Sequence, residues 1–292
     1  MKYRPEANEF EGDGHDGLAQ VMWHVTDVCP LSCPYCFATK TSQSVEPAEI
    51  GPLCQVLHEL GVLKVDIGGG EPMTFRHLPQ VVESLSGLDI ETTITTSGTG
   101  THRQLDWLLG NLHIFSRVII SIDGPESIHD SLRGRKGSYL AAIELVRQVA
   151  ASPVGRLRVN TVITPQLLND SVLIALSSDL APRGPLEWCL IQPHEANATA
   201  GFSRYAVSDS DFSSVVRRAE VAIARQSVPV SLISRSRNDY TGYWVLYPDR
   251  SLRQHTDGPQ DYVAAMDVLS TDVATIRGEI QRRGQSVPLR TI

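Results

Sequence analysis

Residues 19–36 read AQVMWHVTDVCPLSCPYC. The segment Ala19–Thr26 is rich in apolar and β-branched residues, which predicts a buried β-strand. Three cysteines, Cys29, Cys33 and Cys36, follow on the loop after it. Thiolates packed this closely can hold three irons of a cubane cluster, whereas a cluster ligated by protein alone takes four. The fourth iron would then have an open position at which a small molecule can bind.

A structural zinc site and three buried thiols are the alternatives for these cysteines. Structural zinc takes four protein ligands, and the other cysteines of the chain, Cys54 and Cys189, stand alone in the sequence. Cys54 lies on the apolar face of a predicted helix and Cys189 lies within a predicted strand, so we expect both in the hydrophobic core. Because no cysteine follows Cys189, we expect a single cluster.

Short β-type runs alternate with segments of helical spacing as far as Gln192. The predicted strands are Ala19–Thr26, Leu63–Ile67, Ile90–Thr95, Arg117–Ile122, Leu157–Ile163 and Leu186–Ile191. The predicted helices between them are Pro47–Leu60, His77–Ser86, Arg103–Gly110, Ser138–Ala151 and Leu167–Leu180. Strict alternation implies a parallel sheet with right-handed crossovers. Six units are too few to close an eight-stranded barrel. The predicted α/β fold is therefore an open, partial (βα)6 TIM-like barrel, with ligands at the carboxyl ends of its strands.

The chain divides into three predicted parts. Residues 1–18 form a polar N-terminal segment, residues 19–192 form the barrel core, and residues 193–292 form a C-terminal region that caps the substrate. The capping region has a predicted helix, hairpin and helix at Ser208–Gln226, Tyr240–His255 and Asp272–Arg283.

Composition excludes several classes of partner. The chain of 292 residues has a formal net charge of −7 and a pI of about 5.7, which argues against a nucleic-acid polymer as partner, because such a surface is normally basic. No apolar run is long enough to span a bilayer, and the polar N-terminus does not have the pattern of a signal peptide. We expect a cytoplasmic protein without a membrane partner, in a compartment where clustered cysteines serve metal or redox chemistry.

The cysteine spacing, with an aromatic residue before the last cysteine, resembles the defining motif of the radical S-adenosylmethionine (SAM) superfamily. The resemblance extends over about Ala19–Gln192. It implies a 4Fe–4S cluster on Cys29, Cys33 and Cys36, with SAM at the open iron and Tyr35 in the cofactor site.

The resemblance also implies which strand ends contact SAM. The implied cofactor residues are Tyr35, Gly69, Gly70, Glu71, Pro72, Ser97, Ser121, Asp123, Arg133, Asn160 and Ile191. The Gly-Gly-Glu-Pro turn resembles the element that hydrogen-bonds the methionine amino group, and Ser121 and Asp123 resemble the ribose and carboxylate region. Arg133, rather than Arg135, resembles the arginine that meets the SAM carboxylate. Ser97 departs from the family, because many relatives have asparagine there.

By this resemblance the chain is an enzyme that cleaves SAM reductively to a 5′-deoxyadenosyl radical and abstracts hydrogen from a small-molecule substrate. The cofactor carries the difficult chemistry, and the protein supplies orientation. An electron donor such as flavodoxin or ferredoxin is the implied protein partner. The alternative from another class is a non-catalytic iron–sulfur electron carrier or redox sensor.

Two stretches, Trp23–Ala38 and Asn238–Gln254, are similar to the bacterial viperin-like enzymes, which dehydrate nucleoside triphosphates. A nucleotide or nucleoside is therefore the first candidate substrate. The alternative is a natural-product tailoring enzyme acting on a sugar, an amino acid or a ribosomal peptide. A triphosphate site needs convergent cations, and the candidates are Lys40, Arg76, Arg133, Arg135, Arg235 and Arg237. The predicted substrate contacts are His194, Glu195, Tyr243 and Trp244.

Overall fold

A computed structural model of the chain describes residues 18–36, 38, 41–181, 186–194, 202–225, 230–240, 242–255 and 262–283. Glu195, Lys40 and residues 1–17 of the predicted N-terminal segment lie outside these ranges. Within the ranges, no helix combines the length and the apolar character that crossing a bilayer would require.

The strands of the described residues form one sheet in the order β10-β9-β8-β1-β2-β3-β4-β5-β6-β7. Their bounds are β1 (Gln20–Thr26), β2 (Lys64–Gly69), β3 (Glu91–Thr96), β4 (Arg117–Ser121), β5 (Leu157–Val162), β6 (Leu186–Ile191), β7 (Val230–Arg235), β8 (Trp244–Leu246), β9 (Ser251–His255) and β10 (Tyr262–Asp267). Neighbours from β8 through β1 to β7 are parallel, and only the β8–β9 and β9–β10 pairs are antiparallel. The predicted α/β class with a parallel sheet is confirmed.

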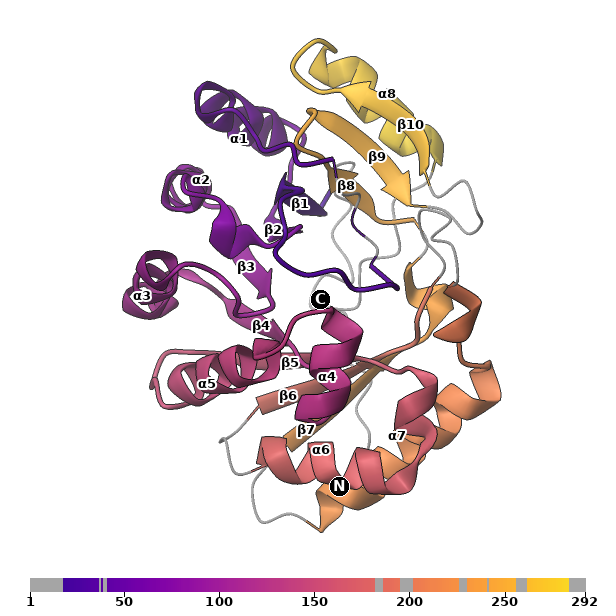
Figure 1. The fold of residues 1–292 in the computed structure, drawn as a ribbon. Helices are drawn as coiled ribbons and strands as arrows, with labels where there is room; N and C mark the ends of the chain where they lie inside the picture. The colour runs from indigo at the N-terminus through magenta and orange to yellow at the C-terminus, as the bar shows by residue number, and fades with distance from the viewer. Residues whose placement is uncertain are drawn as a thin grey trace.

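Helices cover the outer face of the curved sheet, as Figure 1 shows for α1, α2, α3 and α5. The α-helices are α1 (Ile50–Glu59), α2 (Leu78–Ser86), α3 (His102–Gly110), α4 (Glu126–Arg133), α5 (Ser138–Ala150), α6 (Asp170–Leu180), α7 (Asp209–Ala224) and α8 (Val273–Arg283). Short 3-10 turns are η1 (Pro47–Glu49), η2 (Pro72–Thr74), η3 (Leu112–Ile114), η4 (Pro165–Leu168), η6 (Phe202–Arg204) and η7 (Arg237–Tyr240). In α1 the buried residues include Leu53, Cys54 and Leu57, which is the apolar face that the sequence predicts.

The region after residue 192 extends the same sheet. The predicted hairpin is present as β8 and β9, and the predicted helices are α7 and α8. The sequence did not predict β7, which pairs in parallel with β6, or the parallel pairing of β8 with β1. The C-terminal region therefore contributes strands on both sides of the six predicted ones.

The sheet curls, and its inner face is called the lumen below. Ile119 on β4 packs with Tyr243, Val245 and Tyr247 of the β8 segment, although three strands separate β4 from β8 in the sheet. Such a contact requires the sheet to close on itself over these strands. Val21, Trp23 and Val25 point the other way, into the main core beneath the helices, as the alternation of side chains along a strand requires.

Candidate cofactor site

The loop that carries the three cysteines follows β1 and is fixed by backbone hydrogen bonds from two directions. The Gly70 amide donates to the Thr26 carbonyl at 2.6 Å, and the Glu71 amide donates to the Val28 carbonyl at 2.8 Å. On the other side, the Ser32 amide donates to the Arg133 carbonyl at 3.0 Å. The cysteines are thus held between the Gly-Gly-Glu-Pro turn after β2 and the end of α4.

Glycine is required at both contacts because the loop approaches so closely. A Cβ on Gly70 would lie 2.4 Å from the Val28 carbonyl oxygen and 2.6 Å from the Asp27 carbonyl carbon. Gly134 ends α4 with a φ of +65°, and a Cβ there would lie 2.0 Å from the Ser32 hydroxyl oxygen. Because glycine has no Cβ, Gly70 lets the cysteine loop approach the turn this closely.

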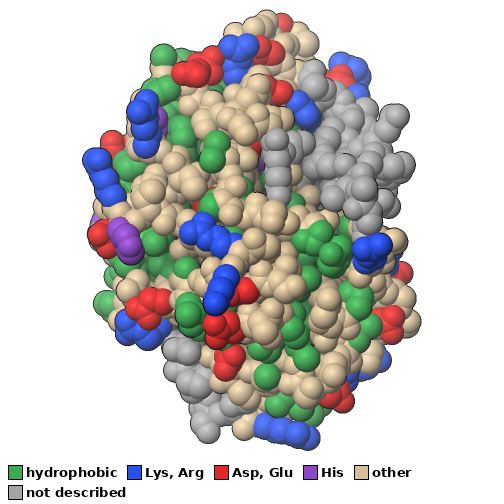
Figure 2. Space-filling view, viewed as in Figure 1, with side chains coloured by type: hydrophobic (Ala, Val, Ile, Leu, Met, Phe, Trp, Pro, Cys, Tyr) green, Lys and Arg blue, Asp and Glu red, His purple; other side chains and the backbone are tan. Residues whose placement is uncertain are grey.

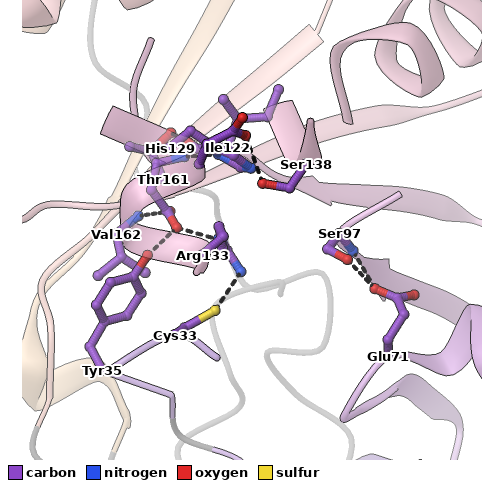
Figure 3. Close-up of polar contacts among 12 residues, drawn as sticks. Cys33, Tyr35, Glu71, Ser97, Ile122, His129, Arg133, Ser138, Thr161 and Val162 are labelled. Carbon is purple, nitrogen blue, oxygen red and sulfur yellow. Dashed lines mark hydrogen bonds and ion pairs between the residues drawn. The ribbon is translucent and has the colours of Figure 1, made fainter. Parts of the chain in front are cut away.

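Glu71 links this turn to the end of β3. Its buried carboxylate accepts hydrogen bonds from the backbone amides of Met73 at 3.0 Å and Ser97 at 2.7 Å. It also accepts from the Thr96 hydroxyl at 2.5 Å and from the Ser97 hydroxyl. The Ser97 hydroxyl is in turn 2.7 Å from that of Thr99. Two predicted cofactor residues, Glu71 and Ser97, therefore contact each other (Figure 3). Pro72 begins η2 directly after the glutamate.

Cys33 lies in a small buried cluster of side chains with Tyr35 and Leu132, and the partly buried Cys29 and Cys36 pack against this cluster. Burial raises the pKa of the Cys29 thiol to about 11, with smaller contributions from Glu71 and the neighbouring thiols, and burial also raises the pKa of Cys33. Both thiols are therefore protonated at neutral pH in the metal-free protein. A metal or cluster must displace those protons to bind, because the thiolate is the ligand.

The donor set at this loop fits an iron–sulfur cluster. Among the residues that the structure describes, no three His, Cys, Asp or Glu side chains converge on a position for a single ion. A cubane needs no such convergence, because each cysteine ligates a different iron. Beside the thiols, the Arg133 Nε is buried and has no hydrogen-bond acceptor in the described residues. A buried cation donor without an acceptor suits a site that takes an electron-rich group.

Arg133, Asp123 and Tyr35 form a connected network next to the cysteines (Figure 3). The Arg133 Nη2 lies 2.6 Å from the Asp123 Oδ2, and the Tyr35 hydroxyl donates to the same oxygen at 2.5 Å. The Arg133 Nη1 lies 3.8 Å from the Cys33 sulfur. Arg135, by contrast, is exposed. The structure therefore places Arg133 at the cysteine loop and leaves Arg135 outside it.

The remaining predicted cofactor residues lie at neighbouring strand ends. Ser121 on β4 is opposite Asn160 on β5, and Ile191 on β6 is opposite Val162. The Asn160 Oδ1 is buried without a hydrogen-bond donor among the described residues. Register thus gathers three of the predicted positions along one edge of the sheet, where ligands of parallel sheets bind.

The predicted substrate residues separate into two groups. Tyr243 faces the lumen and stacks on His255 with the ring centroids 4.7 Å apart and the planes at 13°. His194 lies against the same His255, at 4.9 Å between ring centroids. Trp244 points to the opposite side of β8 and is fully buried in the main hydrophobic core. Tyr247 and His255 face the lumen beside Tyr243. The alternation of side chains along β8 and β9 would have indicated this once the register of the two strands was known.

The basic residues considered for a triphosphate differ in their exposure. Arg76 and Arg135 are exposed, whereas Arg235 is buried at the end of β7. Arg237 pairs with α7 at 2.8 Å, and Lys40 is outside the described residues. Figure 2 shows basic and acidic side chains interspersed over the face in view.

Comparison with known proteins identifies the family. The sequence pattern described as the Radical SAM superfamily matches residues 23–172, about half of the chain. The chain belongs to the radical SAM superfamily. Membership of this superfamily implies SAM and an iron–sulfur cluster as cofactors.

Curated radical SAM relatives include proteins acting on different molecules. GTP 3′,8-cyclase of Mycolicibacterium smegmatis is 29% identical over 153 residues, which cover 48% of this chain and 41% of the cyclase. PqqA peptide cyclase of Rhizobium meliloti is 32% identical over 41% of this chain and 33% of its own length. For both of these relatives the chain spans less than half of their length. The S-adenosylmethionine-dependent nucleotide dehydratase of Flammeovirga pacifica is 23% identical over 257 residues, covering 80% of this chain and 81% of the dehydratase.

Solved structures show the same fold. The crystal structure of Streptococcus suis SuiB bound to S-adenosylmethionine has a TM-score of 0.70 at 16% identity and covers 94% of this chain and 67% of SuiB. The structure of anSMEcpe with bound AdoMet has a TM-score of 0.62 at 14% identity and covers 88% of this chain and 82% of that protein. At these identities the likeness concerns the fold alone.

Proposed function

We propose that this radical SAM chain is an enzyme that holds a 4Fe–4S cluster on Cys29, Cys33 and Cys36 and acts with SAM on a nucleotide or nucleoside. The observation that carries the substrate class is the match to a nucleotide dehydratase, which runs over 80% of this chain and 81% of the dehydratase. The match is therefore longer than a shared cysteine motif and extends over most of both chains.

The lumen supports a planar, partly charged substrate. Ile119, Val245 and Tyr247 belong to one buried cluster on its inner face. The Arg253 guanidinium lies 4.5 Å from the Tyr247 ring centroid, and the Tyr243–His255 stack lies on the same side of the sheet. Aromatic faces suit a nucleobase, and Arg253, which pairs with Asp249 at 2.7 Å, adds a cation beside them.

When bound, the cluster and SAM would supply radical chemistry for the removal of a hydrogen atom from the substrate. The chain's own residues orient the parts. The cysteine loop is fixed between the Glu71 turn and α4, and Ser121 and Asn160 present polar groups at the strand ends. Orientation of this kind supplies much of the rate in a two-centre reaction.

An external electron donor has to reach the cluster, and a flavodoxin or ferredoxin is the proposed class. Val28 directly precedes Cys29 and is 42% exposed. It lines an open cavity of about 700 Å³ together with Phe75, Arg76 and Arg250. The residue before Cys29 is thus exposed at this cavity, and we propose that the donor approaches there.

The proposal is tested with the protein reconstituted with iron and sulfide, given dithionite and SAM, and analysed for 5′-deoxyadenosine. Wild type is expected to produce it, Cys33→Ala to produce none, and Cys54→Ala, a change in the core, to retain iron and activity. No product above the Cys33→Ala background would favour the electron-carrier or sensor alternative.

The substrate class is tested in the same assay with nucleoside triphosphates deuterated on the ribose. Transfer of deuterium into 5′-deoxyadenosine is the expected result. If deuterium is not transferred while 5′-deoxyadenosine still forms, the nucleotide proposal is wrong, and labelled sugars, amino acids and peptides are the next panel.

A further inference from the structure

Arg133 contacts one particular cysteine of the three. It is the last residue of α4, its side chain is 12% exposed, and its Nη1 lies 3.8 Å from the Cys33 sulfur. The sequence assigned this arginine to the carboxylate of SAM, yet in the structure two of its nitrogens are directed at Asp123 and Cys33. Figure 3 shows the guanidinium pointing at the Cys33 sulfur.

The direction of the guanidinium is fixed by the surroundings of Asp123. The Asp123 carboxylate is fully buried and accepts from the Tyr35 hydroxyl at 2.5 Å and from the Val162 amide at 2.9 Å. The Asp123 amide donates to the His129 Nδ1 at 3.1 Å. These contacts hold both carboxylate oxygens of Asp123 in place. The Arg133 Nη2 pairs with the Asp123 Oδ2, and the Arg133 Nη1 then points towards the Cys33 sulfur.

An N–H group that donates to a cluster sulfur withdraws electron density and stabilises the more negative, reduced cluster. We propose that Arg133, oriented by Asp123 and Tyr35, donates to the Cys33 sulfur and thereby raises the reduction potential of the cluster. The inference rests on the proposed function, because it requires the cluster on the three cysteines. The step affected is the uptake of one electron by the oxidised cluster from an external low-potential reductant, and no bond forms or breaks at Arg133.

The test is a redox titration of the reconstituted protein without SAM, followed by the electron paramagnetic resonance signal of the reduced cluster. Arg133→Gln is expected to lower the equilibrium constant for reduction about tenfold, which is about 59 mV for a one-electron couple. Arg133→Lys keeps the charge but not the fork that reaches two partners, so a smaller fall is expected. Tyr35→Phe leaves the ion pair between Arg133 and Asp123 in place, so its reduction potential is expected to fall least.

Arg135→Gln is the matched control, because Arg135 lies two residues after Arg133 and is exposed. The reduction potential of this variant is expected to equal that of wild type. If Arg133→Gln cannot retain the cluster, the titration of Arg133→Lys decides, and its reduction potential is expected to lie below that of wild type. The proposal is wrong if Arg133 variants that hold the cluster have the same reduction potential as wild type, even if they bind SAM more weakly. If the wild-type protein itself binds no iron and sulfide, the proposed function fails, and this outcome is distinct from failure of the inference about Arg133.

Discussion

The Glu71 carboxylate accepts hydrogen bonds from two backbone amides and two hydroxyl groups in a fully buried setting. Sequence comparison singled out this residue as part of a cofactor-binding turn. Its contacts join the turn after β2 to the end of β3. They therefore connect two segments that the sequence assigned to the cofactor, the one with Glu71 and the one with Ser97. A single side chain therefore determines how the segments on one side of the site are spaced.

Glu71→Gln is expected to lower the free energy of unfolding by about 1–3 kcal/mol, because the new amide NH₂ would face donors that now have an acceptor. The measurement is urea unfolding of the metal-free protein. Glu83→Gln, on the exposed side of α2, is the control and is expected to stay within about 0.5 kcal/mol of wild type. Equal midpoints for the two variants would contradict the role given to Glu71.

At the scale of elements, the alternation of strands and helices in residues 19–192 could be predicted because it depends on local apolar spacing. The six predicted strands match β1 to β6 to within a few residues. The short helix α4 (ESIHDSLR) was not predicted, because its sequence is polar and its two buried residues are His129 and Leu132. Asp130 of α4 accepts hydrogen bonds from the Gly137 and Tyr139 amides at the start of α5, and apolar periodicity does not reveal such contacts.

The packing of the Gly-Gly-Glu-Pro turn on the cysteine loop makes an element-scale prediction. Gly70→Ala is expected to destabilise the protein by about 1–3 kcal/mol and to reduce iron retention, because its Cβ would meet backbone atoms of Asp27 and Val28 within 2.7 Å. Gly68→Ala is the matched control, because a Cβ at Gly68 meets nothing within 4 Å. Iron content after desalting and thermal unfolding measure the difference, and identical behaviour of the two variants would show that the close approach does not matter.

At the scale of the whole molecule, the curled sheet buries histidines that titrate at ordinary pH in an unfolded chain. Burial lowers the pKa of His24 in the lumen to about 3, and burial lowers the pKa of His129 to about 4. Below pH 6.5 the unfolded chain binds protons that the folded chain does not. The stability contributed by the neutral histidines is therefore complete above pH 6.5 and is lost as the pH falls towards 3 to 4.

The free energy of unfolding is expected to decrease between pH 6.5 and 5, by up to about 1.4 kcal/mol per pH unit for each of these histidines. Urea unfolding at several pH values measures the slope. In His24→Gln the slope is expected to be shallower than in wild type, because one of the titrating groups is gone. A variant with an unchanged slope would mean that His24 does not carry this pH dependence.

The sequence by itself indicated the three cysteines as candidate ligands, the six strands β1 to β6 and the turns at their ends, because these depend on spacing between residues close together in the chain. Only the tertiary structure decided that Arg133 meets Asp123 and Cys33, because α4 and the cysteine loop are distant in sequence and touch through Ser32. It also decided that Trp244 belongs to the core and Tyr243 to the lumen. The face of each depends on the register in which β8 pairs with β1, and a shift of one residue would exchange them.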